Sequence, residues 1–107
     1  MKKIIGIGNA LVDALATLKN DDLLEMFGLP KGSMTLIGDV EQRRIQECFS
    51  SLSAQRATGG SAGNTMLALA NLDMCPGFIG TIGNDATGHF FADNCVQRGI
   101  EPYLTVL

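Results

Sequence analysis

A glycine-rich turn, followed by an apolar helix and a buried strand, constrains the fold of this chain more than any other feature. The turn is Gly-Gly-Ser-Ala-Gly at residues 59–63, and Asn64 follows it directly. Glycine tolerates positive φ and lets a ligand approach the main chain closely. Residues 66–72 have high helix propensity, and residues 77–82 have the pattern of a buried strand. Together they predict one unit of an α/β fold, whose helix start offers free N–H groups to an anion or a polyol oxygen.

The same stretch resembles the first signature of the PfkB (ribokinase-like) family of sugar and nucleoside kinases. In that family Gly-Gly-x-x-x-Asn opens a helix, and a strand ending in Gly-x-Asp-x-x-Gly follows at a fixed distance. Here Asn64 closes the first element, and Gly83, Asp85 and Gly88 form the second without a gap. The resemblance implies the N-terminal part of a ribokinase-like, doubly wound parallel α/β sheet, with strands of a small β lid. It also implies a structural role for Asp85, which would accept hydrogen bonds from backbone N–H groups.

Composition and charge argue against several other classes of protein. The chain has 107 residues, 46% of them hydrophobic, so it can bury the core of one domain at most. The net charge is −3 and no basic run occurs, so we expect no nucleic-acid partner. No apolar stretch reaches transmembrane length, so we expect no membrane association. Cys48, Cys75 and Cys95 lack Cys-x-x-Cys spacing, which argues against a zinc site or disulfides and favours a cytoplasmic location.

Asn9 and Asp13 follow the first predicted strand, a buried parallel strand over residues 3–7. Open α/β sheets bind ligands at the carboxyl ends of their strands. A carboxylate accepts two hydroxyl protons, and an amide both donates and accepts, so the pair suits a polyol. The local sequence alone also allows a capped turn at Asn9 and a solvated Asp13. The pair resembles the family element Gly-Asn-x-x-x-Asp, which implies that both side chains bind the hydroxyls of a ribose or another sugar.

Three helices are expected outside the glycine-rich element. They span residues 22–27, 40–52 and 87–99, and Gly28 and Gly99 end the first and the last. In the last helix, Phe90, Phe91, Cys95 and Val96 are expected to face inward. His89, the only histidine, has no partner nucleophile or metal spacing and is expected to lie at the surface or in packing.

The stretch at residues 28–36, Gly-Leu-Pro-Lys-Gly-Ser-Met-Thr-Leu, resembles the adenosine-kinase-like branch of the family. The resemblance implies a β lid over the substrate, with Val12, Met34 and Leu36 as candidate apolar contacts to a base. Ordinary lid packing is the simpler explanation for each of these three side chains. The predicted lid strands are residues 12–18, 33–37 and 102–107.

The second family signature, Asp-Thr-x-Gly-Ala-Gly-Asp, is the one implied to supply the catalytic base and the amides that hold the transferring phosphate. No such sequence occurs here, so we expect no catalytic residue, ATP site or metal ligand within this chain. Residues 1–107 are therefore predicted to be a single partial domain of a kinase that uses ATP and Mg²⁺ and phosphorylates a sugar or nucleoside. The predicted substrate-binding residues are Asn9, Asp13, Gly59, Gly60 and Asn64.

Two alternatives stay open. The chain could be a truncated, non-catalytic product that binds a small polyol or only associates with itself, or a generic α/β fragment without a retained site. A fragment of a parallel sheet exposes strand edges and apolar helix faces. We therefore expect the chain to self-associate through a sheet edge or the lid, or to be part of a longer protein.

Overall fold

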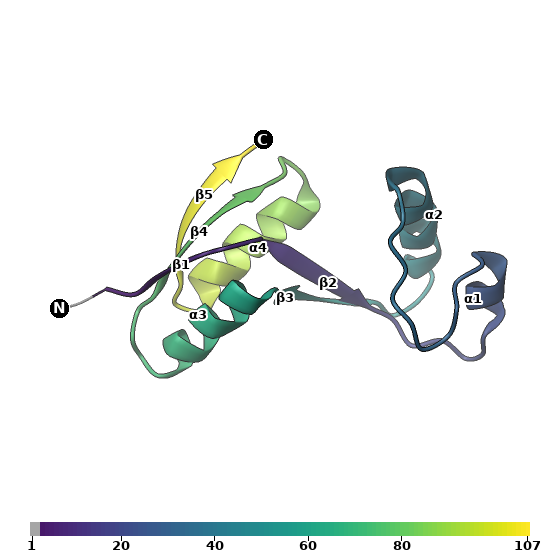
Figure 1. The fold of residues 1–107 in the computed structure, drawn as a ribbon, viewed down its shortest axis with the longest axis horizontal. Helices are drawn as coiled ribbons and strands as arrows, with labels where there is room; N and C mark the ends of the chain where they lie inside the picture. The colour runs from purple at the N-terminus through teal and green to yellow at the C-terminus, as the bar shows by residue number, and fades with distance from the viewer. Residues whose placement is uncertain (1–2) are drawn as a thin grey trace. The chain divides into compact units, whose positions relative to one another are not determined.

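The computed structural model describes residues 3–107 and shows an α/β fold (Figure 1). The chain divides into two compact units, one formed by residues up to 13 together with 56–107, and one formed by residues 14–55. The sequence predicted a single partial domain. Length bounds the number of domains but does not show which segments contact one another. In chain order the elements are β1 (Ile5–Ile7), β2 (Leu11–Leu15), α1 (Asp22–Met26), α2 (Asp39–Phe49), β3 (Gln55–Gly59), α3 (Ser61–Asn71), β4 (Gly77–Ile82), α4 (Ala86–Gln97) and β5 (Glu101–Val106).

A three-stranded parallel sheet in the order β1-β4-β5 forms the centre of the first unit. Parallel strands need crossover connections, and α3 and α4 provide them. Both helices pack on the same face, because a Cβ added at Gly6 would lie 3.0 Å from Met66 of α3, while the Phe78 ring lies 5.3 Å from the Phe91 ring of α4. Gly6 and Phe78 are register partners and point to that one face. The predicted parallel α/β arrangement is confirmed.

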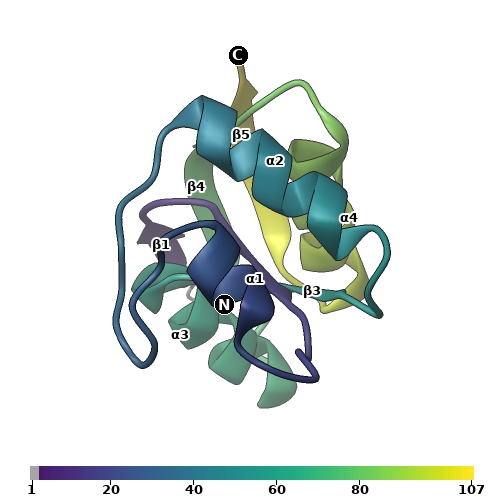
Figure 2. The same ribbon diagram turned by 90° about the vertical axis from the view of Figure 1, so that its right-hand side faces the viewer.

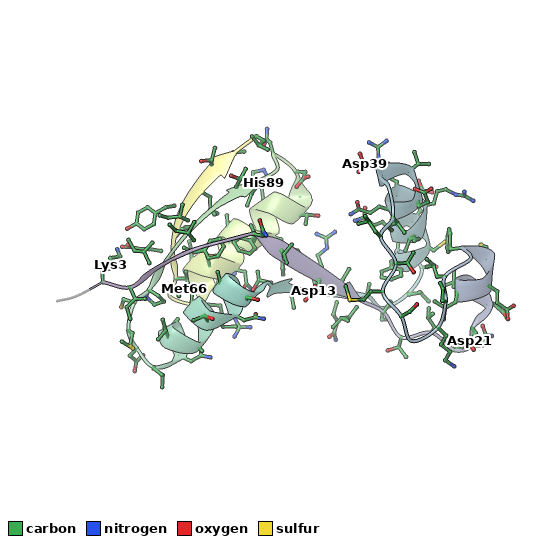
Figure 3. All side chains as sticks on the ribbon, viewed as in Figure 1. Lys3, Asp13, Asp21, Asp39, Met66 and His89 are labelled. Atoms are coloured by element: carbon green, nitrogen blue, oxygen red, sulfur yellow. The ribbon has the colours of Figure 1, made fainter. Side chains whose placement is uncertain are left out.

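The core of this unit lies between the sheet and its two helices (Figures 1 and 3). Burial raises the pKa of the Cys95 thiol in this core. Val96, which was expected to face inward, is 66% exposed, because the inward stripe of α4 is narrower than predicted. The buried side chains are Met66, Phe78, Ile82, Phe91, Cys95 and Ile100.

Both ends of α4 agree with the sequence. The Asp85 carboxylate accepts a hydrogen bond from the Gly88 backbone N–H at 2.7 Å, which is the structural role predicted for this residue. Gly99 follows the helix with φ of 80°, a conformation that favours glycine and stops the helix. His89 is exposed on α4, in agreement with a surface position (Figure 3).

Neither α3 nor α4 of the first unit covers the opposite face of the sheet, which we call the bare face, and its apolar side chains are exposed. Ile5 is 47% exposed, Ile7 76%, Ile79 38% and Tyr103 46%. The prediction of a buried first strand is therefore wrong. β1 is an edge strand with a single neighbour, and only one of its faces is covered.

The C-terminal strand also departs from the sequence prediction. Residues 102–107 were predicted as a lid strand, but β5 pairs with β4 in parallel from the pair Gly77–Glu101 to the pair Ile82–Val106. The 12-residue helix α4 returns the chain to run beside β4 in the same direction, which is the usual result of a β-α-β connection. Pro102 is compatible with this place because β5 is an edge strand.

Of the two other predicted lid strands, one forms and one does not. β2 starts one residue before the predicted strand at 12–18 and ends at Leu15, and it pairs with β3 in a separate two-stranded sheet. Residues 34–38 have neither helix nor strand, so the strand predicted at 33–37 is wrong. Met34 and Leu36 are fully exposed, and a four-residue apolar run is too short to specify a strand by its pattern alone.

Figure 2 shows helices α1 and α2 of the second unit. Side chains from both helices line a small apolar cavity of about 120 Å³. Ile45, Cys48 and Phe49 line it from α2 and form an apolar stripe on that helix. Val40 is 67% exposed and does not belong to this stripe, because it lies in the first turn of the helix. None of the helices formed by residues 3–107 is long and apolar enough to cross a membrane.

Candidate functional site

The side chains of β2 alternate between the core and the glycine-rich turn. Val12 is half-buried and packs against the core, whereas Leu11 and Asp13 lie on the opposite side of the strand. A Cβ added at Gly59 would lie 2.7 Å from Oδ2 of Asp13, so the carboxylate lies directly against the Gly59 main chain. Figure 3 shows Asp13 on β2. The turn and the carboxylate therefore form one local site.

Gly60 joins β3 to α3 in a conformation that other residues rarely adopt. Its φ is 90° and its ψ is 149°. A Cβ at this position would lie 3.1 Å from the Asn9 carbonyl oxygen and 3.4 Å from Cδ1 of Leu11. The Gly60 carbonyl oxygen accepts a hydrogen bond from the Asn64 backbone N–H at 2.9 Å. This turn brings Asn9, Leu11 and the first turn of α3 together.

The helix that follows starts earlier than the sequence indicated. α3 begins at Ser61, so Gly63 and Asn64 lie in its first turn instead of before it. A Cβ at Gly63 would meet nothing within 4 Å, and Ala62 packs closely on Gly8, which holds the helix start against the end of β1. Asn64 is exposed and belongs to the turn that carries the free N–H groups of the helix.

Four of the five predicted binding residues thus converge at the carboxyl end of β1: Asn9, Asp13, Gly59 and Gly60. Among residues 3–107, neither of the two ion pairs nor any side-chain hydrogen bond engages Asp13, so its carboxylate is available to hydroxyl protons. The three predicted lid contacts to a base stay a prediction. Val12 packs in the core, and Met34 and Leu36 belong to the second unit.

An open cavity of about 470 Å³ lies at the carboxyl ends of β1 and β4, and Asn9 and Leu11 line it. Thr81 and Thr105, which are paired across β4 and β5, line it as well. Neither threonine was predicted from the sequence, because the register that brings them together is a property of the assembled sheet. Leu11 could have been found, since it lies two residues before Asp13 and therefore shares its side of the strand.

Clusters of potential metal ligands are not a feature of this site. Among residues 3–107, no three His, Cys, Asp or Glu side chains gather closely enough to hold an ion together. The chemistry that the described residues offer is hydrogen bonding by a carboxylate, an amide and the main chain of a glycine turn.

Comparison with known proteins identifies the family. The model of the family described as pfkB family carbohydrate kinase matches residues 22–106, most of the chain. The chain belongs to the pfkB family. The resemblance carried by the Gly-Gly-x-x-x-Asn and Gly-x-Asp-x-x-Gly elements is thereby confirmed.

Solved structures of adenosine kinases and of a probable sugar kinase share the fold. Adenosine kinase from Trypanosoma brucei brucei matches with a TM-score of 0.84 and 18% identity, over 98% of this chain and 33% of its own. Adenosine kinase from Sinorhizobium meliloti matches with a TM-score of 0.71 and 33% identity, over 98% and 31%. A probable sugar kinase protein from Rhizobium etli CFN 42 matches with a TM-score of 0.67 and 31% identity, over 94% and 29%. The chain spans about a third of these structures, and the predicted ribokinase-like fold is confirmed.

Proposed function

We propose that residues 1–107 form the substrate-binding part of a kinase that transfers a phosphoryl group from ATP to a hydroxyl of a nucleoside or sugar. The observation that carries this proposal is the Asp13 carboxylate, which makes no side-chain hydrogen bond or ion pair within residues 3–107 and lies against the Gly59-Gly60 turn beside Asn9. Adenosine is the favoured substrate. The stretch at residues 28–36 resembles adenosine kinases, and adenosine kinases are among the similar structures.

Each residue of the site has a distinct part in this proposal. Asp13 and Asn9 bind hydroxyls of the substrate, the turn lets the main chain close on it, and Asn64 binds from the helix start. Phosphoryl transfer also needs a positioned nucleotide, Mg²⁺ and a base, and the proposal places all three in a longer protein outside these residues. The chain alone is expected to bind without catalysis. Its three free cysteines favour the reducing cytoplasm as its compartment.

Isothermal titration of the chain with adenosine, ribose and fructose tests the proposal. Saturable binding of one of them at one site, lost in Asp13→Ala, would support it. An absence of heat with all three compounds would contradict it. A parallel assay with ATP and Mg²⁺ is expected to give no phosphorylated product, and product formation would contradict the assignment of catalysis to residues outside the chain.

A second candidate function is a non-catalytic, self-associating product, and the bare face of the sheet favours it. The intact mass of the protein from its native source separates the two. A mass of 11.3 kDa would mean that the cell makes this piece alone and that its role is binding or assembly. A mass about three times larger would favour the kinase, because this chain covers about a third of the length of the matched structures.

Self-association is itself testable on the bare face. Apolar side chains that are exposed together on one surface favour association, so Ile7→Lys is expected to shift the chain from dimers or larger species toward the monomer in sedimentation velocity. Leu72→Lys is a matched control, because Leu72 is 71% exposed at the end of α3 and lies away from this face. A monomeric unaltered chain would contradict the prediction.

The two turn glycines should respond differently to alanine. At Gly59 the added Cβ meets only the end of the Asp13 side chain, so Gly59→Ala is expected to displace the carboxylate and weaken adenosine binding with little loss of stability. Gly60 has a φ of 90°, a conformation that is strained for any residue with a side chain. Gly60→Ala is therefore expected to cost about 1–3 kcal/mol of folding free energy. Calorimetry and urea unfolding of both variants measure the contrast, and equal unfolding free energies would contradict it.

A further inference from the structure

We infer that Asn94 of α4 is a positioning residue for the Gly59-Gly60 turn and that it acts through Thr58. The Thr58 hydroxyl donates a hydrogen bond to Oδ1 of Asn94 at 3.2 Å, across 36 positions of sequence. Thr58 immediately precedes the turn, and Asn94 touches none of the proposed binding residues by a side-chain hydrogen bond of its own. The inference rests on the function proposed for the turn.

This hydrogen bond differs from the others of its kind. It is partly buried, whereas the other hydrogen bonds between two side chains in the described residues are exposed to solvent. A hydrogen bond shielded from water is electrostatically stronger than an exposed one, and breaking it leaves a shielded polar group without a partner. The link is therefore suited to hold a segment in place.

The strand that carries Thr58 needs such a link. β3 pairs only with β2, and a two-stranded ribbon is marginally stable by itself. The contact between Gly59 and the Asp13 carboxylate is made within this ribbon, at its end. Val12 anchors the β2 side of the ribbon in the core, and the Thr58–Asn94 hydrogen bond is the side-chain hydrogen bond that ties the β3 side to α4.

Asn94 is a firm anchor because α4 is fixed along its length. Phe91 and Cys95, on either side of Asn94, are buried in the core, and Asp85 caps the start of the helix. Asparagine is a poor helix former, since its side chain competes for backbone hydrogen bonds. No side-chain hydrogen bond within the helix explains an asparagine in the last turn of α4, whereas the hydrogen bond from Thr58 does.

Removal of either partner tests the inference. Asn94→Leu and Thr58→Val delete the hydrogen bond at similar volume, and each is expected to weaken adenosine binding about three- to tenfold in calorimetry. The double variant should bind no more weakly than either single variant, because both remove the same link. Asn94→Asp and Thr58→Ser keep the acceptor and the donor, and they should restore binding to within about twofold of the unaltered chain.

A matched control separates positioning from general loss of stability. Ile100→Val removes a buried methyl group just before β5, outside the turn, and is expected to lower the melting temperature without changing adenosine affinity. Wild-type affinity in Asn94→Leu, or an equal loss in Asn94→Leu and Ile100→Val at equal melting temperature, would overturn the inference. So would an Asn94→Asp variant that binds as weakly as Asn94→Leu.

A second measurement does not need a ligand. The Asn64 backbone N–H donates a hydrogen bond to the Gly60 carbonyl oxygen. The hydrogen-exchange rate of this backbone N–H therefore reports the order of the turn. Exchange at Asn64 should accelerate severalfold in Asn94→Leu and Thr58→Val but not in Ile100→Val, and unchanged exchange would overturn the inference. If exchange accelerates while the unaltered chain binds none of the titrated compounds, the coupling stands and the proposed function fails.

Discussion

Replacement of Asp13 by alanine is expected to weaken adenosine binding by about a hundredfold or more. The proposed role gives this carboxylate two hydroxyl protons to accept, and a hydrogen bond to a charged group contributes about 1.5–3 kcal/mol. Because Asp13 is exposed and makes no side-chain hydrogen bond or ion pair within residues 3–107, the unfolding free energy should change little. Titration calorimetry and urea unfolding of the same preparation measure both effects.

Two further variants show whether the effect belongs to this carboxylate. Asp13→Asn keeps the shape but loses the charge, and its affinity should fall between those of Asp13→Ala and the unaltered chain. Asp21→Ala removes an exposed carboxylate from the second unit, where it pairs with Lys31 at 3.2 Å, and should leave affinity unchanged. Asp13→Ala with unaltered affinity would contradict the assignment of the site.

The largest effect on stability is expected at Gly88. This residue is buried at the start of α4, where an added Cβ would overlap the carbonyl oxygen of Gly83. The overlapping group is main chain, so it cannot rotate away as the end of a side chain can. A shift of Gly88 that relieves this overlap would also weaken the hydrogen bond from its backbone N–H to the Asp85 carboxylate, which caps the helix. Gly88→Ala is expected to cost about 3 kcal/mol of unfolding free energy, measured by urea denaturation.

Gly63 provides the matched control, because it is also a glycine in the first turn of a helix. A Cβ at Gly63 meets nothing within 4 Å, and its φ is not positive. Alanine stabilises a helix relative to glycine, so Gly63→Ala should raise the unfolding free energy by about 0.5–1 kcal/mol. Similar unfolding free energies for the two variants would show that the contact at Gly88 does not constrain the fold.

The sequence was most informative where the signal is local. The stop at Gly99 and the cap at Asp85 each depend on a few neighbouring residues. The spacing of the glycine elements was enough to indicate the family. The candidate site could be predicted as a set of residues for the same reason, since Gly-Asn-x-x-x-Asp and Gly-Gly each lie within a short segment.

Other features depended on which distant segments meet. The sequence alone determined the four helices approximately, the strand at β4 and the polar residues at the end of β1. Only the tertiary structure decided that β5 joins the parallel sheet, that Ile7 lies bare on an edge strand and that Thr58 is tied to Asn94. Helix propensity, caps and turns arise from interactions between residues close in the chain. Strand partners, burial and long-range hydrogen bonds arise from the packing of the assembled sheet against its helices, which no local pattern specifies.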